Sequence, residues 1–240
     1  MIVWLASYPR SGNTFFRILL NQLYGIKTYS IYNDPLFDKL PGSSDVIGHQ
    51  ILEEDLEELS EKSELTFIKT HDLPSDNNPA IYLVRDGRDS LVSYAHYLIS
   101  FHQNSRRLSI QKKIKSIFGW NEYNEILKKL IIENDKKHGN WSENVKQWQN
   151  HDKKTHTIKF EDLIKNPLDQ LEKAVNSLSP EQKFSLNGND IPSFEELHAR
   201  WPKFFRQGQS GKWQQSMNDE LQELFKVHHG SVMKELGYKV

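Results

Sequence analysis

Residues 2–25 read IVWLA, SYPRSGN, TFFRILLNQLY and G in succession, and this stretch decides the fold. The apolar run at 2–6 is typical of a short strand buried on both faces of a parallel sheet. Residues 14–24 carry a helical apolar face, and Gly25 is a typical residue just past a helix end. A strand, a tight polar turn and a helix in this order predict the opening of a βαβ unit.

The same alternation continues along the chain. We predict further strands at residues 66–69, 80–84 and 156–160, and helices at 89–101, 108–149, 161–178, 194–205 and from 214 onward. The sequence shows no repeat, low-complexity linker or composition shift that would mark a domain boundary. Alternating strands and helices predict α/β architecture, here one three-layer domain over residues 1–240 with a central parallel sheet.

The composition restricts the function. The chain has 240 residues, with 31 Lys+Arg against 32 Asp+Glu and no cysteine. The near-neutral charge argues against general nucleic-acid binding, and the absence of cysteine excludes thiol nucleophiles and zinc–thiolate sites. Apolar runs fall short of the ~20 residues of a membrane helix, and the N-terminus lacks the basic region of a signal peptide. We therefore expect a cytoplasmic protein with no nucleic-acid or membrane partner.

The turn at residues 7–13 has the chemistry of an anion site. Gly12 lets the backbone approach an anion closely at the positive end of the helix that follows. The available donors are the backbone N–H groups of Asn13, Thr14 and Phe15, the hydroxyls of Ser11 and Thr14, and the guanidinium of Arg10. An ordinary capped turn with a surface arginine is the alternative, and the turn alone leaves both open. It is not a Walker A loop, because Asn13 stands where the lysine belongs.

The segment 7–15 (SYPRSGNTF) resembles the 5′-phosphosulfate-binding loop of the sulfotransferases that use 3′-phosphoadenosine 5′-phosphosulfate (PAPS). Further segments resemble the same family in the same order, namely FIKTH at 67–71, YLVRDGRD at 82–89, FEDL at 160–163 and FRQGQSGKW at 205–213. Because they run from residue 7 to residue 213, the resemblance implies the P-loop-kinase-like sulfotransferase fold for the whole chain.

The resemblance also implies where PAPS, the co-substrate, and its product adenosine 3′,5′-bisphosphate (PAP) bind. The implied cofactor-binding residues are Arg10, Ser11, Gly12, Asn13, Thr14 and Phe15 at the 5′ end, Arg85, Ser93, Arg206, Gln207 and Gly208 at the 3′-phosphate, and Phe160. Phe15 stands where the cytosolic enzymes have an adenine-stacking Trp, and Phe160 replaces a Tyr. The alternatives are a salt bridge between Arg85 and Asp86 or Asp89, and simple helix packing for Ser93.

The implied catalytic residues are His71, Lys69 and Arg10. A histidine with an ordinary pKa of about 6.5 is largely neutral near pH 7 and can accept the proton of an attacking hydroxyl or amine. Lys69 would stabilise charge on the transferred group, and Arg10 would assist the leaving phosphate. The alternative for His71 is a structural, hydrogen-bonded histidine. No pattern of metal ligands is evident, so we expect no metal.

The acceptor is expected to be a small molecule. Aromatic residues follow the first helix and the third predicted strand, and they fit either an acceptor pocket or the core; they are Tyr29, Tyr32, Phe37, Tyr94, Tyr97, Phe101 and His102. The segment 108–140 fits either a lid or a helical cover. Two other functions stay open, a phosphotransferase of the P-loop class and an inactive nucleotide-binding protein of the same fold. The segment 214–223 lacks the family's Thr-Val dimer motif, so no oligomeric state is predicted.

Overall fold

The computed structural model describes residues 1–32, 42–102, 122–151, 155–178, 186–187, 190–202, 205 and 210–240. Two compact units alternate along the chain. The first consists of Met1–Arg85 with Val145–Gly208, and the second of Asp86–Asn144 with Gln209–Val240. Each unit therefore draws on two separate stretches of sequence.

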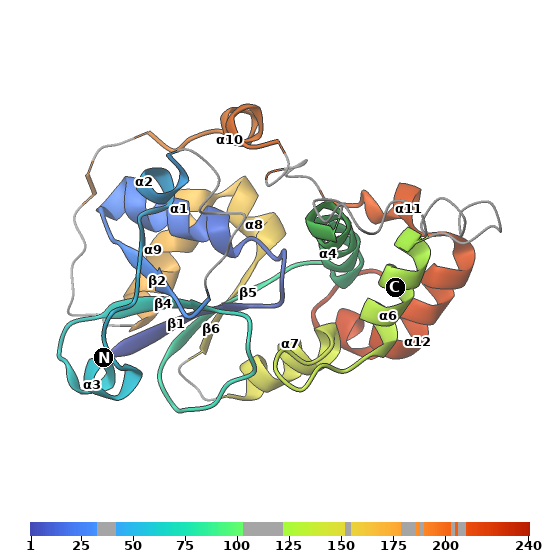
Figure 1. The fold of residues 1–240 in the computed structure, drawn as a ribbon, viewed down its shortest axis with the longest axis horizontal. Coiled ribbons are helices and arrows are strands. Elements are labelled where there is room, and N and C mark those ends of the chain that lie inside the picture. Colours follow the sequence, from blue (N-terminus) through green and yellow to red (C-terminus); the bar gives the residue numbers. More distant parts are fainter. Residues whose placement is uncertain are drawn as a thin grey trace. The chain divides into compact units, whose positions relative to one another are not determined.

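The first unit is built on a parallel sheet (Figure 1). Its strands are β1 (Ile2–Ser7), β2 (Thr28–Ser30), β3 (His49–Gln50), β4 (Thr66–Thr70), β5 (Ala80–Val84) and β6 (Thr155–Lys159). The described residues give six strands in the order β3-β2-β4-β1-β5-β6, and every adjacent pair is parallel. Leu5 is opposite Lys69 and Ala6 is opposite Thr70, so β1 and β4 end side by side. The polar residues after both strands therefore share one edge of the sheet.

Helices cover both faces of this sheet. The helices of the first unit are α1 (Asn13–Tyr24), α2 (Ser43–Ile47), α3 (Leu56–Glu61), α8 (Phe160–Lys165), α9 (Pro167–Leu178) and α10 (Phe194–Arg200), and α7 (Trp141–Asn150) enters it at Val145. In Figure 1, α1, α2, α8 and α9 lie on one side of the sheet. Their apolar residues form the main core with Leu5 of β1 and Leu83 of β5. On the other side, Trp148 of α7 stacks on Tyr82 with ring centroids 6.2 Å apart. The predicted α/β architecture with a parallel sheet between helical layers is confirmed.

The second unit is helical in its described residues. It contains α4 (Gly87–His102), α6 (Glu122–Ile132), the first turn of α7, α11 (Trp213–Ser216) and α12 (Asp219–Glu235). A Cβ added to Gly87 would lie 2.7 Å from the Trp141 ring and 2.8 Å from the Phe225 ring. The start of α4 thus packs directly against the aromatic core of this unit, which also contains the fully buried His229.

The predicted helix at 108–149 is wrong as a single element. Residues 103–121 lie outside the described residues, and a turn at 133–140 separates α6 from α7. Asp135 Oδ1 accepts the backbone N–H groups of Lys137 and His138 at 2.7 and 2.9 Å, and Gly139 has a φ of 68°. Asn134 Oδ1 accepts the N–H of Asn140 at 2.9 Å. Short polar side chains that bind nearby N–H groups favour a turn over a continuing helix.

Candidate functional site

The loop after β1 has a backbone built around Gly12. Gly12 has a φ of 101°, and a Cβ there would lie 2.5 Å from Cδ2 of Phe160. It caps α1 without a side-chain hydrogen bond, and the first turn of α1 contains no acidic residue. The N-terminal dipole of a twelve-residue helix is therefore not neutralised by its own sequence, which suits an anion. A residue without a Cβ therefore allows both the left-handed backbone of this turn and the close approach of the Phe160 ring.

Arg10 adopts a left-handed backbone conformation with a φ of 68°. Such a conformation costs a residue other than glycine about 1–3 kcal/mol, and it is common where structure serves function. Asn13 ties this loop to the sheet, because its buried Nδ2 donates to the carbonyl of Leu5 at 2.8 Å. The start of α1 and the end of β1 are thereby held together.

Arg85 at the end of β5 faces the same loop. Its guanidinium lies 4.6 Å from the centre of the Phe160 ring, and its Nη1 donates to the carbonyl of Arg10 at 3.3 Å. Gly12 contacts the same ring, so the structure gathers Arg10, Gly12, Arg85 and Phe160 into one cluster. The Arg85 guanidinium thus lies beside a loop whose helix N-terminus has no side-chain cap, and a guanidinium group suits phosphate oxygens.

His71 follows β4 at the same edge of the sheet. Its Nδ1 lies 2.8 Å from the carbonyl oxygen of Ser7 and 3.3 Å from the Ser7 hydroxyl. A carbonyl oxygen only accepts, so the ring donates through Nδ1–H, and in the neutral ring Nε2 carries the lone pair. This is the tautomer that a general base needs if Nε2 is the atom that takes up the proton.

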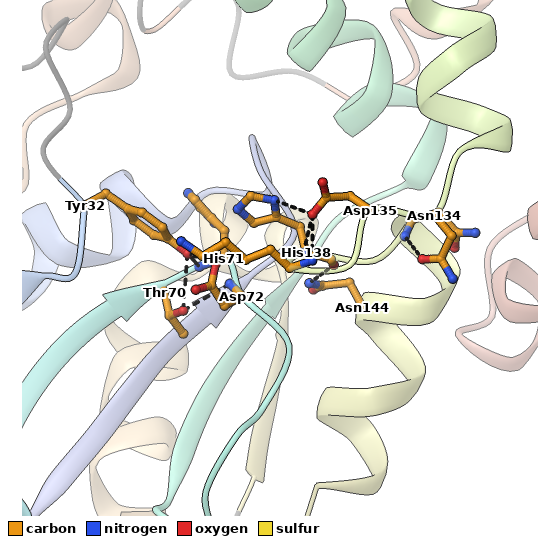
Figure 2. A network of polar contacts seen from close by, with 10 residues as sticks. Tyr32, Thr70, His71, Asp72, Asn134, Asp135, His138 and Asn144 are labelled. Carbon is orange, nitrogen blue, oxygen red and sulfur yellow. Dashed lines mark hydrogen bonds and ion pairs between the residues drawn. The ribbon is translucent and has the colours of Figure 1, made fainter. Parts of the chain in front are cut away.

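Tyr32, after β2, lies against His71 (Figure 2). The two rings are stacked with centroids 5.8 Å apart and planes 18° from parallel. The phenol oxygen accepts the backbone N–H of His71 at 2.9 Å and donates its own proton to Asp72. Burial first, and then the hydrogen bond to Asp72, raise the pKa of Tyr32. The phenol therefore stays protonated and neutral.

Lys69 is the last but one residue of β4. Only 7% of it is exposed, and its Nζ lies 5.8 Å from the centre of the Tyr32 ring, within the range of a cation–π contact. The order Lys69, Thr70, His71 at the strand end thus places a buried cation and a histidine against one tyrosine. A positive charge held in a site with little water acts strongly on charge that develops nearby.

In the second unit, the acidic residues at the start of α4 hold the segment that precedes α11. Asp86 forms an ion pair with Arg88 at 2.7 Å, and the Arg88 guanidinium lies 3.9 Å from the centre of the Trp213 ring. The buried carboxylate of Asp89 accepts the N–H groups of Gly211 and Trp213, at 2.7 and 3.0 Å. The segment 210–213 is therefore fixed to the start of α4.

Several predicted residues lie elsewhere. Phe15 is 7% exposed and belongs to the main core, and its stacking on adenine stays a prediction. Ser93 lies on α4 in the second unit, so its pairing with Arg85 stays a prediction as well. Arg206, Gln207 and Gly208 are outside the described residues, as are Phe37 and the side chains of Phe101 and His102. Tyr94 and Tyr97 stack on each other with centroids 6.3 Å apart.

The sequence analysis did not single out two acidic residues that fix their surroundings, Asp72 in the first unit and Asp89 in the second. Asp72 binds Tyr32, and Asp89 binds the backbone near Trp213. Asp72 directly follows His71, and this adjacency was the one available signal. For Asp89, the sequence indicates only the alternative of a salt bridge with Arg85.

The comparisons identify the class of protein. The family model of the sulfotransferase domain matches residues 2–237, so the chain belongs to the sulfotransferase family and is an enzyme of that class. The rat protein "Sulfotransferase 1E1" is 23% identical, with 98% of this chain and 84% of that protein covered. "Flavonol 3-sulfotransferase" of Flaveria bidentis is 24% identical, with 92% and 78% covered.

Solved structures agree on the fold. Mouse sulfotransferase SULT7A1 complexed with PAP has a TM-score of 0.61 at 20% identity, covering 98% of this chain and 87% of that one. Retinol dehydratase in complex with androsterone and PAP has a TM-score of 0.60 at 19% identity, covering 97% and 80%. Among the residues that the structure describes, none of the helices is long and apolar enough to cross a membrane. The same residues contain no group of three His, Asp or Glu side chains arranged to hold a metal ion.

Proposed function

We propose that this sulfotransferase moves a sulfuryl group from PAPS to a hydroxyl or amine of a small-molecule acceptor, with His71 as the base. The observation that carries the proposal is the hydrogen bond from His71 Nδ1 to the carbonyl of Ser7, which leaves the lone pair on Nε2. The parallel register of β1 and β4 supports it, because it brings this histidine to the edge of the sheet that bears the anion loop.

Each residue has one task in this reaction. His71 takes the acceptor's proton at Nε2 as the new O–S or N–S bond forms and the bond from sulfur to the 5′-phosphate oxygen breaks. Lys69 stabilises the charge on the transferred group. Arg10 and the N-terminus of α1 bind the 5′-phosphate of the PAP that leaves.

The nucleotide site extends from this loop. Arg85, Ser93 and Arg206, with the backbone of Gln207 and Gly208, bind the 3′-phosphate in this proposal, and Phe15 and Phe160 form its aromatic walls. The position of Arg85 beside the anion loop supports the assignment, as do the solved structures of relatives whose names include PAP. The names of relatives also mention flavonol, retinol and androsterone, which supports a small-molecule acceptor.

The test is transfer from PAPS to a panel of phenols, alcohols, amines and sugars, followed by mass spectrometry. We expect one acceptor class to gain a single sulfo group and PAP to accumulate in equal amount. Chelator should leave both PAP binding and transfer unchanged. Release of inorganic sulfate without a sulfated acceptor, or dependence on magnesium, would contradict the proposal.

A further inference from the structure

We propose that Tyr32 is a positioning residue that, together with Asp72, holds His71 in the orientation and tautomer required of a base. This proposal rests on the function proposed above for the role of His71 in transfer. It concerns a contact between β2 and the end of β4, which are neighbours in the sheet.

The chemistry determines the direction of the hydrogen bonds that Tyr32 forms with His71 and Asp72. The N–H of His71 can only donate, so the oxygen of Tyr32 is the acceptor of that bond at 2.9 Å. The phenol then gives its own proton to the Asp72 carboxylate. Tyr32 therefore links the backbone of His71 to an anionic residue.

Asp72 is itself held in place from two sides. Its N–H donates to the hydroxyl of Thr70 at 3.0 Å, and its carbonyl accepts the indole N–H of Trp148 at 2.9 Å. The carboxylate that receives the phenol proton is therefore anchored by its own backbone. A phenol bound to a fixed acceptor cannot rotate freely, and its ring stays parallel to the imidazole.

The ring of Tyr32 contacts both predicted catalytic side chains. It stacks on the imidazole of His71 and lies 5.8 Å from Nζ of Lys69. Backbone and ring of His71 are thus held by one residue, while Ser7 fixes Nδ1. Small misplacements of a reacting group are costly, since a displacement of about 1 Å can reduce the rate by about 10²-fold.

The key experiment compares Tyr32→Phe with wild type by two independent measurements. Heteronuclear NMR of the imidazole nitrogens, with the His71 signals assigned by their loss in His71→Gln, reports the tautomer in the ligand-free protein. We expect Nδ1–H in wild type and a mixture with Nε2–H in Tyr32→Phe. In kinetics on the confirmed acceptor, kcat should fall by about 10- to 100-fold while the KM for PAPS changes less than about twofold.

Two Asp72 variants separate hydrogen bonding from charge. Asp72→Ala removes the acceptor of the phenol proton and should reproduce the defect without altering the Tyr32 ring. Asp72→Asn keeps an oxygen that can accept this proton and should restore most of the wild-type tautomer and kcat. If Asp72→Asn is as defective as Asp72→Ala, the carboxylate acts through its charge. The proposed positioning of His71 through the hydrogen bonds of Tyr32 and Asp72 is then wrong. These variants also carry the test if Tyr32→Phe does not fold.

Tyr24→Phe and Asp169→Asn are matched controls, because each makes the same chemical change in the first unit away from this group. Tyr24 ends α1, and Asp169 forms an ion pair with Lys173 on α9. Wild-type tautomer and kcat in Tyr32→Phe, or equal losses in the controls, would overturn the proposal. If wild type transfers no sulfuryl group at all, the proposed function fails. The tautomer measurement still decides whether Tyr32 positions His71.

Discussion

The two compact units each contain a histidine whose Nδ1 forms a hydrogen bond of 2.8 Å, and these two histidines differ in burial and in hydrogen-bond partner. In the first unit, the partly exposed His71 donates to the carbonyl of Ser7 at a strand end. In the second, the Nδ1 of His229 lies 2.8 Å from the hydroxyl of Ser142, and the residue is fully buried. Burial first, and then the neighbouring His228, lower the pKa of His229 to about 4.

This difference shows what a hydrogen-bonded histidine can do in each place. A fixed Nδ1 orients the ring in both units, but orientation alone does not make a base. Proton exchange also needs access to the second nitrogen, and a buried neutral ring strongly resists becoming charged. The proposed role of His71 as the base fits its partial exposure, whereas His229 belongs to the aromatic core around Trp141 and Phe225.

The largest expected effect comes from replacing each of the two histidines in turn. His71→Ala should reduce kcat by about 10² to 10⁴ while the affinity for PAP stays nearly the same. His229→Gln should leave the kcat of the folded protein near wild type and should lower the free energy of unfolding instead. Calorimetry with PAP, turnover on one acceptor and urea unfolding measure the three quantities. Near-normal turnover in His71→Ala would show that His71 is not the base and so does not differ from His229 in this respect.

The acid side of the pH–rate profile sharpens the same result. With His71 as the base, the rate falls on the acid side as its imidazole becomes protonated. The residual activity of His71→Ala should lack this limb. An unchanged limb in the variant would assign the base to another group.

The next effect concerns the strained loop of the first unit. Gly12→Ala should lower the free energy of unfolding by about 2–3 kcal/mol, because its φ of 101° is unfavourable for alanine and its Cβ would meet Phe160. Gly42→Ala is the matched control: its φ is 70°, and no atom of the described residues lies within 4 Å of the added Cβ. The excess loss in Gly12→Ala measures the steric conflict. Equal losses of free energy of unfolding in the two variants would show that the Phe160 ring moves aside without an energetic penalty.

A smaller effect is expected where the second unit holds its C-terminal segment. Asp89→Asn replaces a carboxylate that accepts two N–H groups, and the amide can accept only with its oxygen. Losing one charge-assisted bond should speed tryptic cleavage after Lys212 by about tenfold. Asp219→Asn, an exposed position at the start of α12, makes the same charge change and should cleave as wild type does. An unchanged rate in Asp89→Asn would mean that other contacts fix the segment.

The smallest expected effect is the pH dependence of stability in the second unit. His229 has a lowered pKa in the folded state, so the unfolded chain binds its proton first as the pH falls. The stability from this group is fully present above about pH 6.5 and is lost progressively down to about pH 4. From about pH 7.5 to about pH 5.5 the loss should be about 1 kcal/mol. Urea unfolding of wild type and His229→Gln tests this, since the variant should lack that part of the slope.

The start of the fold was predictable from local sequence. The apolar run of β1, the polar turn and the amphipathic α1 each carry a strong local signal, and the ends of β4 and β5 were found within one residue. The strands β2 and β3 were missed, because three and two residues are too short for a periodic pattern. The turn between α6 and α7 depends on Asp135 binding nearby N–H groups, which overrode the helical pattern around it.

The candidate site was predictable where it depends on strand ends. The resemblance to the sulfotransferases pointed to Lys69, His71 and Arg85, and the structure places all three at or just after the carboxyl ends of parallel strands, where open α/β sheets bind ligands. The contact of Tyr32 with Asp72 joins residues 40 positions apart, and it exists because β2 pairs with β4. Without the short strand β2 in the prediction, nothing in the sequence indicated which aromatic residue would lie on the histidine.

The alternation of the two units along the chain also has a consequence during synthesis. The first unit needs residues up to 208 and the second needs residues up to 240, while the second begins at 86, before the first is finished. The usual vectorial order, in which an N-terminal domain folds while the rest is still on the ribosome, is therefore not open to this chain. Strand β6, for example, pairs with β5 only after residues 86–144 have emerged between them. Until β6 arrives, the outer edge of β5 has no strand partner, and an unpaired strand edge is prone to pairing with another chain.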